Sequence, residues 1–168
     1  MKPVVLSFIG RKGAGKSEVL EAVIGIFKAK GMRAGVIKRL AKDHIEIDQP
    51  EKDTFRYRMQ GAETVMLAGR KRFAMFSNLE EEMPLEKLLS FFEDFDIVFL
   101  EDYFTEDIPK IEIYKSELGE PLSRELNDVL AVCSGQSAEP EAVALLIEKK
   151  FFMHNHFEEE LSSCRGTA

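Results

Sequence analysis

The sequence predicts an α/β fold, a three-layer α/β/α sandwich built on a mostly parallel sheet. Two short segments predict strands: residues 4–9 are mostly apolar, and residues 97–100 have the unbroken apolar character of a strand that is buried on both faces. Between them, apolar residues recur at three- and four-residue spacing from 19 to 27, which predicts an amphipathic helix. Strands and helices then alternate along the chain, and this order favours helices packed on both faces of one sheet.

The first half of the chain continues this alternation. The helix over residues 19–27 is expected to end at Gly31, and residues 34–38 predict a second strand. The polar stretch 39–53 predicts a long loop at the rim of the sheet, and loops of this length are often functional. After it we expect a short helix at 54–60 and strands at 63–67 and 72–76 joined by a Gly-Arg-Lys turn.

The second half adds two helices and three strands. Pro84 can open a helix that runs to Phe92, because its leucines fall on one face. Residues 111–114 alternate between apolar and polar, whereas residues 129–133 are continuously apolar, so we expect the second of these strands to be central in the sheet. The remaining expected elements are a strand at 96–101 and a helix at 139–150.

A glycine-rich octapeptide separates the first strand from the first helix: Gly10-Arg11-Lys12-Gly13-Ala14-Gly15-Lys16-Ser17. This is the spelling and the context of a Walker A phosphate-binding loop, whose backbone N–H groups surround the phosphates of a nucleotide. Lys16 is expected to reach the β- and γ-phosphates, and the Ser17 hydroxyl to ligate Mg²⁺. The sequence therefore predicts that the chain binds a nucleoside triphosphate.

The strand at residues 96–101 ends on a carboxylate, Glu101, and Asp102 follows it. In a P-loop fold, an acid at this edge of the sheet lies near Mg²⁺ or the attacking nucleophile. We predict that Lys16 and Glu101 are the catalytic residues, and that Ser17, Glu101 and Asp48 form the metal site. Asp102 is a second candidate for the acid near Mg²⁺ or the attacking nucleophile. Without the loop, Glu101 would be an ordinary strand-end residue.

The bulk composition limits the classes of protein. The chain has 168 residues, 45% of them hydrophobic, which suits one compact domain. We expect residues 1–150 to form a P-loop nucleotide-binding domain and residues 151–168 a C-terminal helical extension with a disordered tail. Cys133 and Cys164 have no paired spacing and no secretion signal is visible, which indicates the cytoplasm. No apolar run approaches the roughly 20 residues that cross a bilayer.

Charge is distributed unevenly along the chain. The net charge of −7 argues against a general nucleic-acid or anionic-membrane binder. Residues 1–72 nevertheless hold 16 Lys and Arg against 8 Asp and Glu, so an anionic ligand is expected in this half. A candidate second anion site comprises Lys38, Lys52, Asp53, Arg56 and Arg58. The alternative is that these side chains are solvated charges on a helix surface.

Four segments occur in an order that resembles the MobB family, the molybdopterin-guanine dinucleotide biosynthesis protein B family. They are GRKGAGKS, GVIKR, IDQPEKDTFRYRMQGA and DIVFLEDYFTEDIPKIEIYK. The likeness spans most of residues 3–135. Its distinctive part matches a D-x-P-G-K-D pattern followed by G-A, through Asp48, Pro50, Lys52, Asp53, Arg58, Gly61 and Ala62.

The resemblance implies a P-loop protein, usually a homodimer, that binds GTP and Mg²⁺. It implies weak GTPase activity and an accessory role when a partner enzyme attaches GMP to molybdopterin. The chain contains no N-K-x-D motif, so the preference for guanine over adenine is implied by the resemblance only.

The chain departs from the family pattern at several functional positions. The His-rich stretch after the lysine that matches Lys38 is here Arg-Leu-Ala-Lys, and Glu51 stands in place of a glycine. After Glu101 the family shows Gly-Phe-Lys, whereas this chain has Asp102-Tyr103-Phe104. These changes place a carboxylate and an aromatic ring where the family has a flexible backbone position and a lysine.

Two other classes of function fit the residues. A small-molecule kinase would use Asp102 or Asp53 as a base toward an acceptor hydroxyl, and would form ADP only when the acceptor is present. A non-catalytic nucleotide-sensing partner would use the acidic second half to recruit a basic protein, and would bind nucleotide tightly without turnover.

Overall fold

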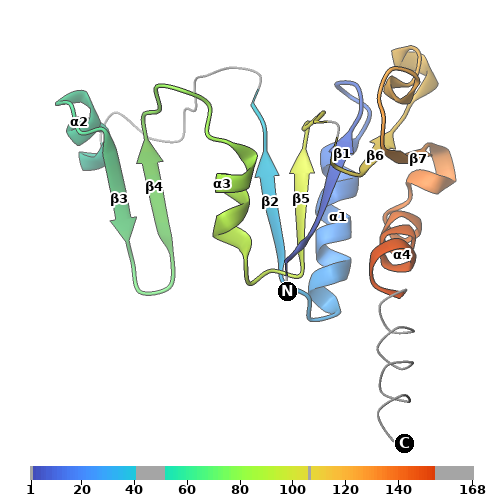
Figure 1. The fold of residues 1–168 in the computed structure, drawn as a ribbon, viewed down its shortest axis with the longest axis horizontal. Helices are drawn as coiled ribbons and strands as arrows, with labels where there is room; N and C mark the ends of the chain where they lie inside the picture. Colours follow the sequence, from blue (N-terminus) through green and yellow to red (C-terminus); the bar gives the residue numbers. More distant parts are fainter. Residues whose placement is uncertain (1, 41–51, 106, 154–168) are drawn as a thin grey trace, which may run out of the picture. The chain divides into compact units, whose positions relative to one another are not determined.

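The computed structural model describes residues 2–40, 52–105 and 107–153 of the chain. The chain forms two compact units, Met1–Arg39 with Leu89–Ala168, and Leu40–Leu88 (Figure 1). Among the described residues, each unit contains one sheet, of five strands in the first unit and two in the second. The glycine-rich loop and the strand-end acid both belong to the first unit, so the structure places them relative to each other.

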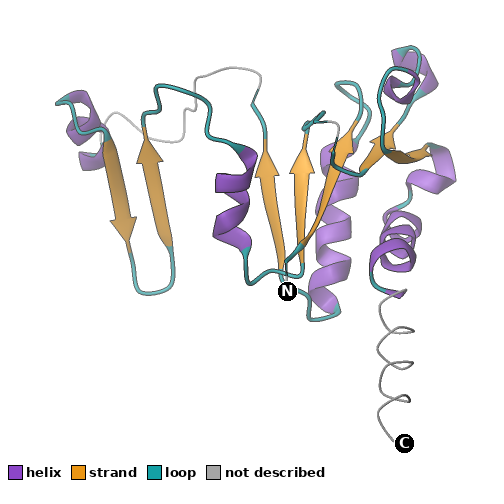
Figure 2. Cartoon of the chain, viewed as in Figure 1, coloured by secondary structure: helices purple, strands orange, loops and turns teal. Residues whose placement is uncertain are grey.

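The sheet of the first unit is parallel throughout, in the strand order β2-β5-β1-β6-β7. Its strands are β1 (Val4–Ile9), β2 (Ala34–Lys38), β5 (Ile97–Glu101), β6 (Lys110–Ile113) and β7 (Val129–Cys133). Helices α1 (Lys16–Ala29) and α4 (Pro140–Phe151) pack together against this sheet (Figure 2). The predicted α/β class with a mostly parallel sheet is confirmed.

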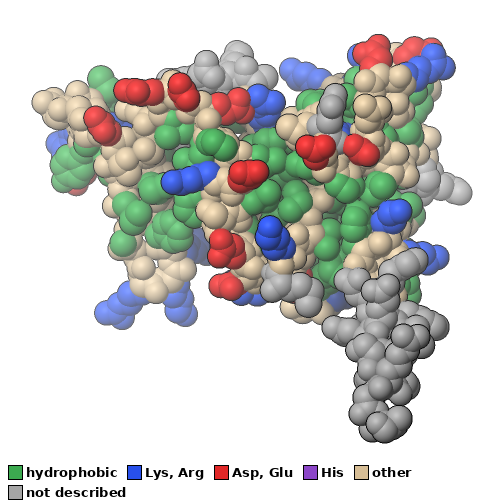
Figure 3. All heavy atoms as spheres, viewed as in Figure 1, with side chains coloured by type: hydrophobic (Ala, Val, Ile, Leu, Met, Phe, Trp, Pro, Cys, Tyr) green, Lys and Arg blue, Asp and Glu red, His purple; other side chains and the backbone are tan. Residues whose placement is uncertain are grey.

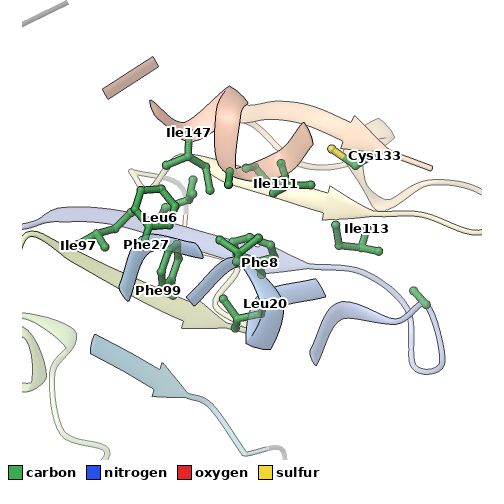
Figure 4. Packing of buried hydrophobic residues seen from close by; sticks show 14 residues of the cluster. Leu6, Phe8, Leu20, Phe27, Ile97, Phe99, Ile111, Ile113, Cys133 and Ile147 are labelled. Atoms are coloured by element: carbon green, nitrogen blue, oxygen red, sulfur yellow. The ribbon is translucent and has the colours of Figure 1, made fainter. Parts of the chain in front are cut away.

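The main core lies between this sheet and the α1–α4 pair (Figure 4). Phe8 and Phe99 meet edge to face with their ring centroids 5.8 Å apart, and Phe27 of α1 lies 5.9 Å from Phe99. All three side chains are fully buried. Aromatic side chains of this size contribute much of a core's hydrophobic free energy, so they fix β1, β5 and α1 as one rigid body.

The opposite face of the sheet is covered by connecting segments. Because side chains alternate along a strand, Ser7 points away from the main core, and its hydroxyl donates to the Tyr103 carbonyl at 2.7 Å. Gly35 of β2 also lies on this face, since it pairs with Val98. A Cβ at Gly35 would lie 2.3 Å from the Phe92 ring, so only glycine admits that ring here.

The prediction that residues 129–133 form a central strand is wrong, because β7 is an edge strand and β6 lies inside the sheet. The alternation in β6 suggested a half-exposed strand, yet Lys110 and Glu112 are both buried. The Lys110 ammonium donates to the carbonyls of Ile108 and Asn127 at 2.7 and 3.3 Å. Glu112 accepts the N–H groups of Leu122 and Ser123 at 2.7 and 2.9 Å. Backbone partners therefore satisfy polar groups that burial would otherwise penalise.

The second unit contains an antiparallel hairpin, a helix at 53–59 and most of the helix at 85–89. The hairpin strands β3 (Thr64–Ala68) and β4 (Phe73–Ser77) pair over their whole length, as the predicted Gly-Arg-Lys turn requires. The turn closes with Gly69 N–H donating to the Arg72 carbonyl at 2.8 Å. Helix α2 (Asp53–Met59) contacts β3, and Val65 is buried.

The predicted helix at 84–92 forms as α3 (Leu85–Leu89) followed by the 3₁₀ turn η1 (Ser90–Phe92). Three more 3₁₀ turns follow, η2 (Ser116–Leu118), η3 (Leu122–Arg124) and η4 (Gly135–Ala138). Most of the predicted extension and tail at 151–168 lies outside the described residues, and its division from the domain stays a prediction. Within the described ranges, no helix has the length and apolar character needed to span a membrane.

Candidate phosphate-binding site

The octapeptide Gly10–Ser17 forms the connection from β1 to α1. Gly10, Gly13 and Gly15 all have positive φ, of 152°, 85° and 92°, and residues other than glycine rarely adopt this backbone conformation. A Cβ at Gly10 would also lie 2.4 Å from the Ile113 carbonyl oxygen. Gly15 caps α1, and no side chain in the described part of the chain caps its first turn. The loop therefore turns sharply onto an open helix N-terminus, which favours an anion.

Lys16 folds back over this loop. Its ammonium donates to the Gly10 carbonyl at 2.9 Å and lies 3.3 Å from the Asp102 Oδ1 atom. Its side chain is 11% exposed and that of Asp102 is 35% exposed. The Asp102 carboxylate therefore partly neutralises the positive charge of Lys16 that would bind a phosphate.

Ser17, Glu101 and Lys38 form a second polar group beside the loop. The Ser17 hydroxyl donates to Glu101 Oε1 at 2.7 Å, and the Lys38 ammonium lies 3.1 Å from Glu101 Oε2. Lys38 and Glu101 are register partners on β2 and β5. Burial alone would raise the pKa of the Glu101 carboxyl, but the hydrogen bonds from Ser17 and Lys38 and the charges of Lys38 and Lys16 hold this pKa below its usual value. Glu101 is therefore ionised at neutral pH and fixed in orientation.

The connection from β6 to β7 contacts the other side of the loop. Lys115 lies two residues after the end of β6, and its ammonium donates to the Gly13 carbonyl at 3.4 Å. The Arg11 guanidinium donates through Nε to the Glu120 carbonyl at 3.1 Å. An open cavity of about 430 Å³ lies here, lined by Gly13, Ala14, Gly15, Glu18, Val19, Ile113, Tyr114, Lys115, Gly135 and Ala138. This cavity is continuous with the glycine loop, so a ligand whose phosphates lie on the loop can extend into it.

The predicted site residues divide into those that the structure brings together and those that it does not. Lys16, Ser17, Glu101 and Asp102 meet at the loop, as predicted. Sequence reasoning assigned Lys38 to a second anion site, but in the structure this side chain pairs with Glu101. The contacts of Lys115 and Glu120 were missed, and the position of Lys115 at the carboxyl end of a strand was the available signal.

The other proposed anion-site residues lie in the second unit. Arg56 pairs with Asp53 on the exposed surface of α2. The Arg58 guanidinium lies 5.9 and 5.8 Å from the ring centroids of Phe55 and Phe76. Lys52 is exposed at the start of α2. Because Lys38 belongs to the first unit, a single site made of all five stays a prediction. Asp48, the predicted metal residue, lies outside the described residues.

A phosphate loop between the first strand and helix, facing carboxylates at the end of a neighbouring parallel strand, defines a P-loop nucleotide-binding fold. Residues 5–135 match the family model "MobB: Molybdopterin guanine dinucleotide synthesis protein B". The chain belongs to the MobB family, as the sequence resemblance indicates.

Curated relatives agree with this assignment. The molybdopterin-guanine dinucleotide biosynthesis adapter protein of Haemophilus influenzae is 30% identical over 147 residues, which cover 86% of this chain and 82% of the relative. The protein of the same name from Escherichia coli is 31% identical over 119 residues, 68% of this chain and 67% of the relative.

Solved structures support the fold. A MobB homolog from Bacillus stearothermophilus superposes with a TM-score of 0.64 at 19% identity, over 87% of this chain and 96% of that one. A crystal structure of molybdopterin-guanine biosynthesis protein B gives a TM-score of 0.67 at 22% identity, over 88% and 98% of the two chains.

Replacement of the strand-end carboxyl should have a pH-dependent effect on stability. Because the Glu101 pKa is lower in the folded chain than its usual value, the stability that this carboxylate contributes is present at neutral pH and is lost as acid protonates it in the folded chain. We expect Glu101→Gln to cost about 1–3 kcal/mol of unfolding free energy at neutral pH, with a smaller difference in acid. Urea unfolding at neutral pH and at acidic pH measures the difference in unfolding free energy between the variant and the unmodified chain. The exposed Glu117→Gln serves as control, and a Glu101→Gln difference that does not change with pH would contradict the account.

Proposed function

We propose that the chain is a GTP-binding accessory protein of molybdenum cofactor biosynthesis, with weak GTPase activity of its own. Family membership supports the pathway, since the matching relatives are adapter proteins for molybdopterin-guanine dinucleotide biosynthesis. The observation that carries nucleotide binding is the arrangement of Lys16 and Ser17 at the start of α1, facing Glu101 and Asp102. In this proposal, the partner is the enzyme that transfers the guanylyl group to molybdopterin.

The residues at the loop fit a magnesium ion. Mg²⁺ prefers oxygen ligands and keeps several waters when it binds beside phosphates. The Ser17 hydroxyl and a Glu101 carboxylate oxygen lie 2.7 Å apart, so both are available at one point beside the loop. When bound, the ion would neutralise phosphate charge, Ser17 would ligate it, and Glu101 would orient Ser17 or the ion's waters. Asp48 remains a proposed further metal residue.

The ribose and the base of a nucleotide would fit the cavity next to the loop. With the β- and γ-phosphates against the backbone of Gly10, Arg11, Lys12, Gly13, Ala14 and Gly15, the ribose and base would extend into the cavity beside η4. The apolar walls supplied by Val19, Ile113 and Ala138 suit a planar base. The choice of guanine rests on family membership.

We also propose that the chain works as a homodimer in the cytoplasm. Figure 3 shows hydrophobic side chains at the surface over the β3–β4 hairpin. Met66, Phe73 and Met75 share one face of this hairpin and are 58%, 69% and 39% exposed. Contiguous exposed apolar side chains indicate a protein contact surface, and a second copy of the chain is the proposed occupant. The free, buried thiol of Cys133 fits a reducing compartment.

Loss of the loop lysine should remove triphosphate binding. We expect Lys16→Ala to weaken Mg²⁺–GTP binding by about 30-fold or more, because a mostly buried cation that would pair with phosphate is lost. Calorimetry with GTP, ATP and molybdopterin measures this, and Lys28→Ala, an exposed lysine at the far end of α1, is the matched control. Absence of triphosphate binding to the unmodified chain would refute the proposal. ADP formation that depends on an added acceptor would favour a kinase instead.

The hairpin face should determine the oligomeric state. Phe73→Ser removes the largest exposed ring from that face, so we expect it to weaken the dimer by about tenfold or more, whereas the exposed Leu79→Ser outside the hairpin should not. Sedimentation equilibrium over a range of concentrations measures the dissociation constants. A chain that stays monomeric throughout, or a dimer that Phe73→Ser leaves intact, would contradict this surface.

A further inference from the structure

We infer that Asp102 is a built-in counter-ion of the phosphate-binding lysine, and that a bound nucleotide must displace it. The carboxylate would make the loop discriminate against phosphate anions that arrive without Mg²⁺. This inference rests on the proposed binding of a triphosphate at the loop, and it adds a residue that controls which anion is accepted.

The backbone holds Asp102 in an unusual conformation. Its φ is +62°, in the left-handed region, and among the described residues only Asp128 is another non-glycine residue with positive φ. Its N–H donates to the Phe8 carbonyl at 3.1 Å, which fixes it to the strand that leads into the loop. A residue other than glycine costs free energy in this conformation, although aspartate tolerates it better than most. A local cost of this kind often marks a functional position.

The Asp102 side chain contacts the lysine of the phosphate-binding loop. Asp102 Oδ1 lies 3.3 Å from the Lys16 ammonium, which also donates to the Gly10 carbonyl at 2.9 Å. An ammonium has three N–H donors, so these two acceptors leave one for a phosphate. Lys16 is only 11% exposed, and solvent therefore screens this pair less than it screens a surface pair. Asp102 thus competes with phosphate for the same cation.

The competition depends on the charge of the incoming anion. A metal-free triphosphate brings several negative charges to within a few ångströms of the Asp102 carboxylate, and the two repel each other. A bound Mg²⁺ cancels two of those charges and reduces the repulsion. Asp102 should therefore weaken binding of metal-free anions more than binding of the magnesium complex, which is selectivity by repulsion.

The test compares Asp102→Asn with Asp128→Asn in the full chain. Asparagine keeps the size of aspartate and tolerates positive φ, so both variants should fold, which urea unfolding checks. Calorimetry with GTP and with inorganic tripolyphosphate, each with Mg²⁺ or with a chelator, gives the affinities. We expect Asp102→Asn to strengthen metal-free binding about three- to tenfold and to change Mg²⁺-bound binding less. Asp128→Asn should match the unmodified chain.

The outcomes separate this inference from the proposed function. If the unmodified chain binds Mg²⁺–GTP and Asp102→Asn leaves all affinities unchanged, the counter-ion role is wrong and the proposed function stands. If Asp102→Asn weakens Mg²⁺–GTP binding, the carboxylate assists the metal, and the inference is overturned. If the unmodified chain binds neither GTP nor tripolyphosphate, the proposed function fails and the inference fails with it.

Discussion

The buried carboxylate of Glu101 is the constraint on which the rest of the site depends. It is 6% exposed, and one oxygen accepts the Ser17 hydroxyl while the other pairs with Lys38. These contacts join three elements, the start of α1 and the ends of β2 and β5. An ionised carboxylate at this depth is tolerated only because both oxygens have partners. The same contacts therefore hold the edge of the sheet together and orient the hydroxyl that a magnesium ion would use.

Much of the first unit was predictable from sequence. The apolar run of β5 and the octapeptide at residues 10–17 are local signals, because burial on both faces and positive φ at glycine are properties of single segments. The Lys38–Glu101 pair was not predictable in this way. It depends on the parallel register of β2 and β5, which sequence spacing does not encode.

The order of the inner strands was the clearest failure of sequence reasoning. Residues 111–114 alternate between apolar and polar, whereas residues 129–133 do not, so the sequence predicts that β7 lies inside the sheet. The structure reverses this because backbone groups before and after β6 provide hydrogen-bond partners for the buried Lys110 and Glu112. Such partners lie up to 17 residues away along the chain, and periodicity cannot reveal them. The departure at Asp102 was visible in the sequence, whereas its contact with Lys16 required the fold.

The proposed magnesium site requires Ser17 and Glu101 to act as one unit in binding Mg²⁺ with the nucleotide. A double-mutant cycle of Ser17→Ala and Glu101→Gln, read by the Mg²⁺ dependence of GTP affinity, tests it most directly. Each single change should weaken Mg²⁺-dependent binding by about 10- to 100-fold, and the double variant should lose little more than either one. If the two effects instead multiply as independent losses, Glu101 does not act through Ser17, and the account of the site is wrong.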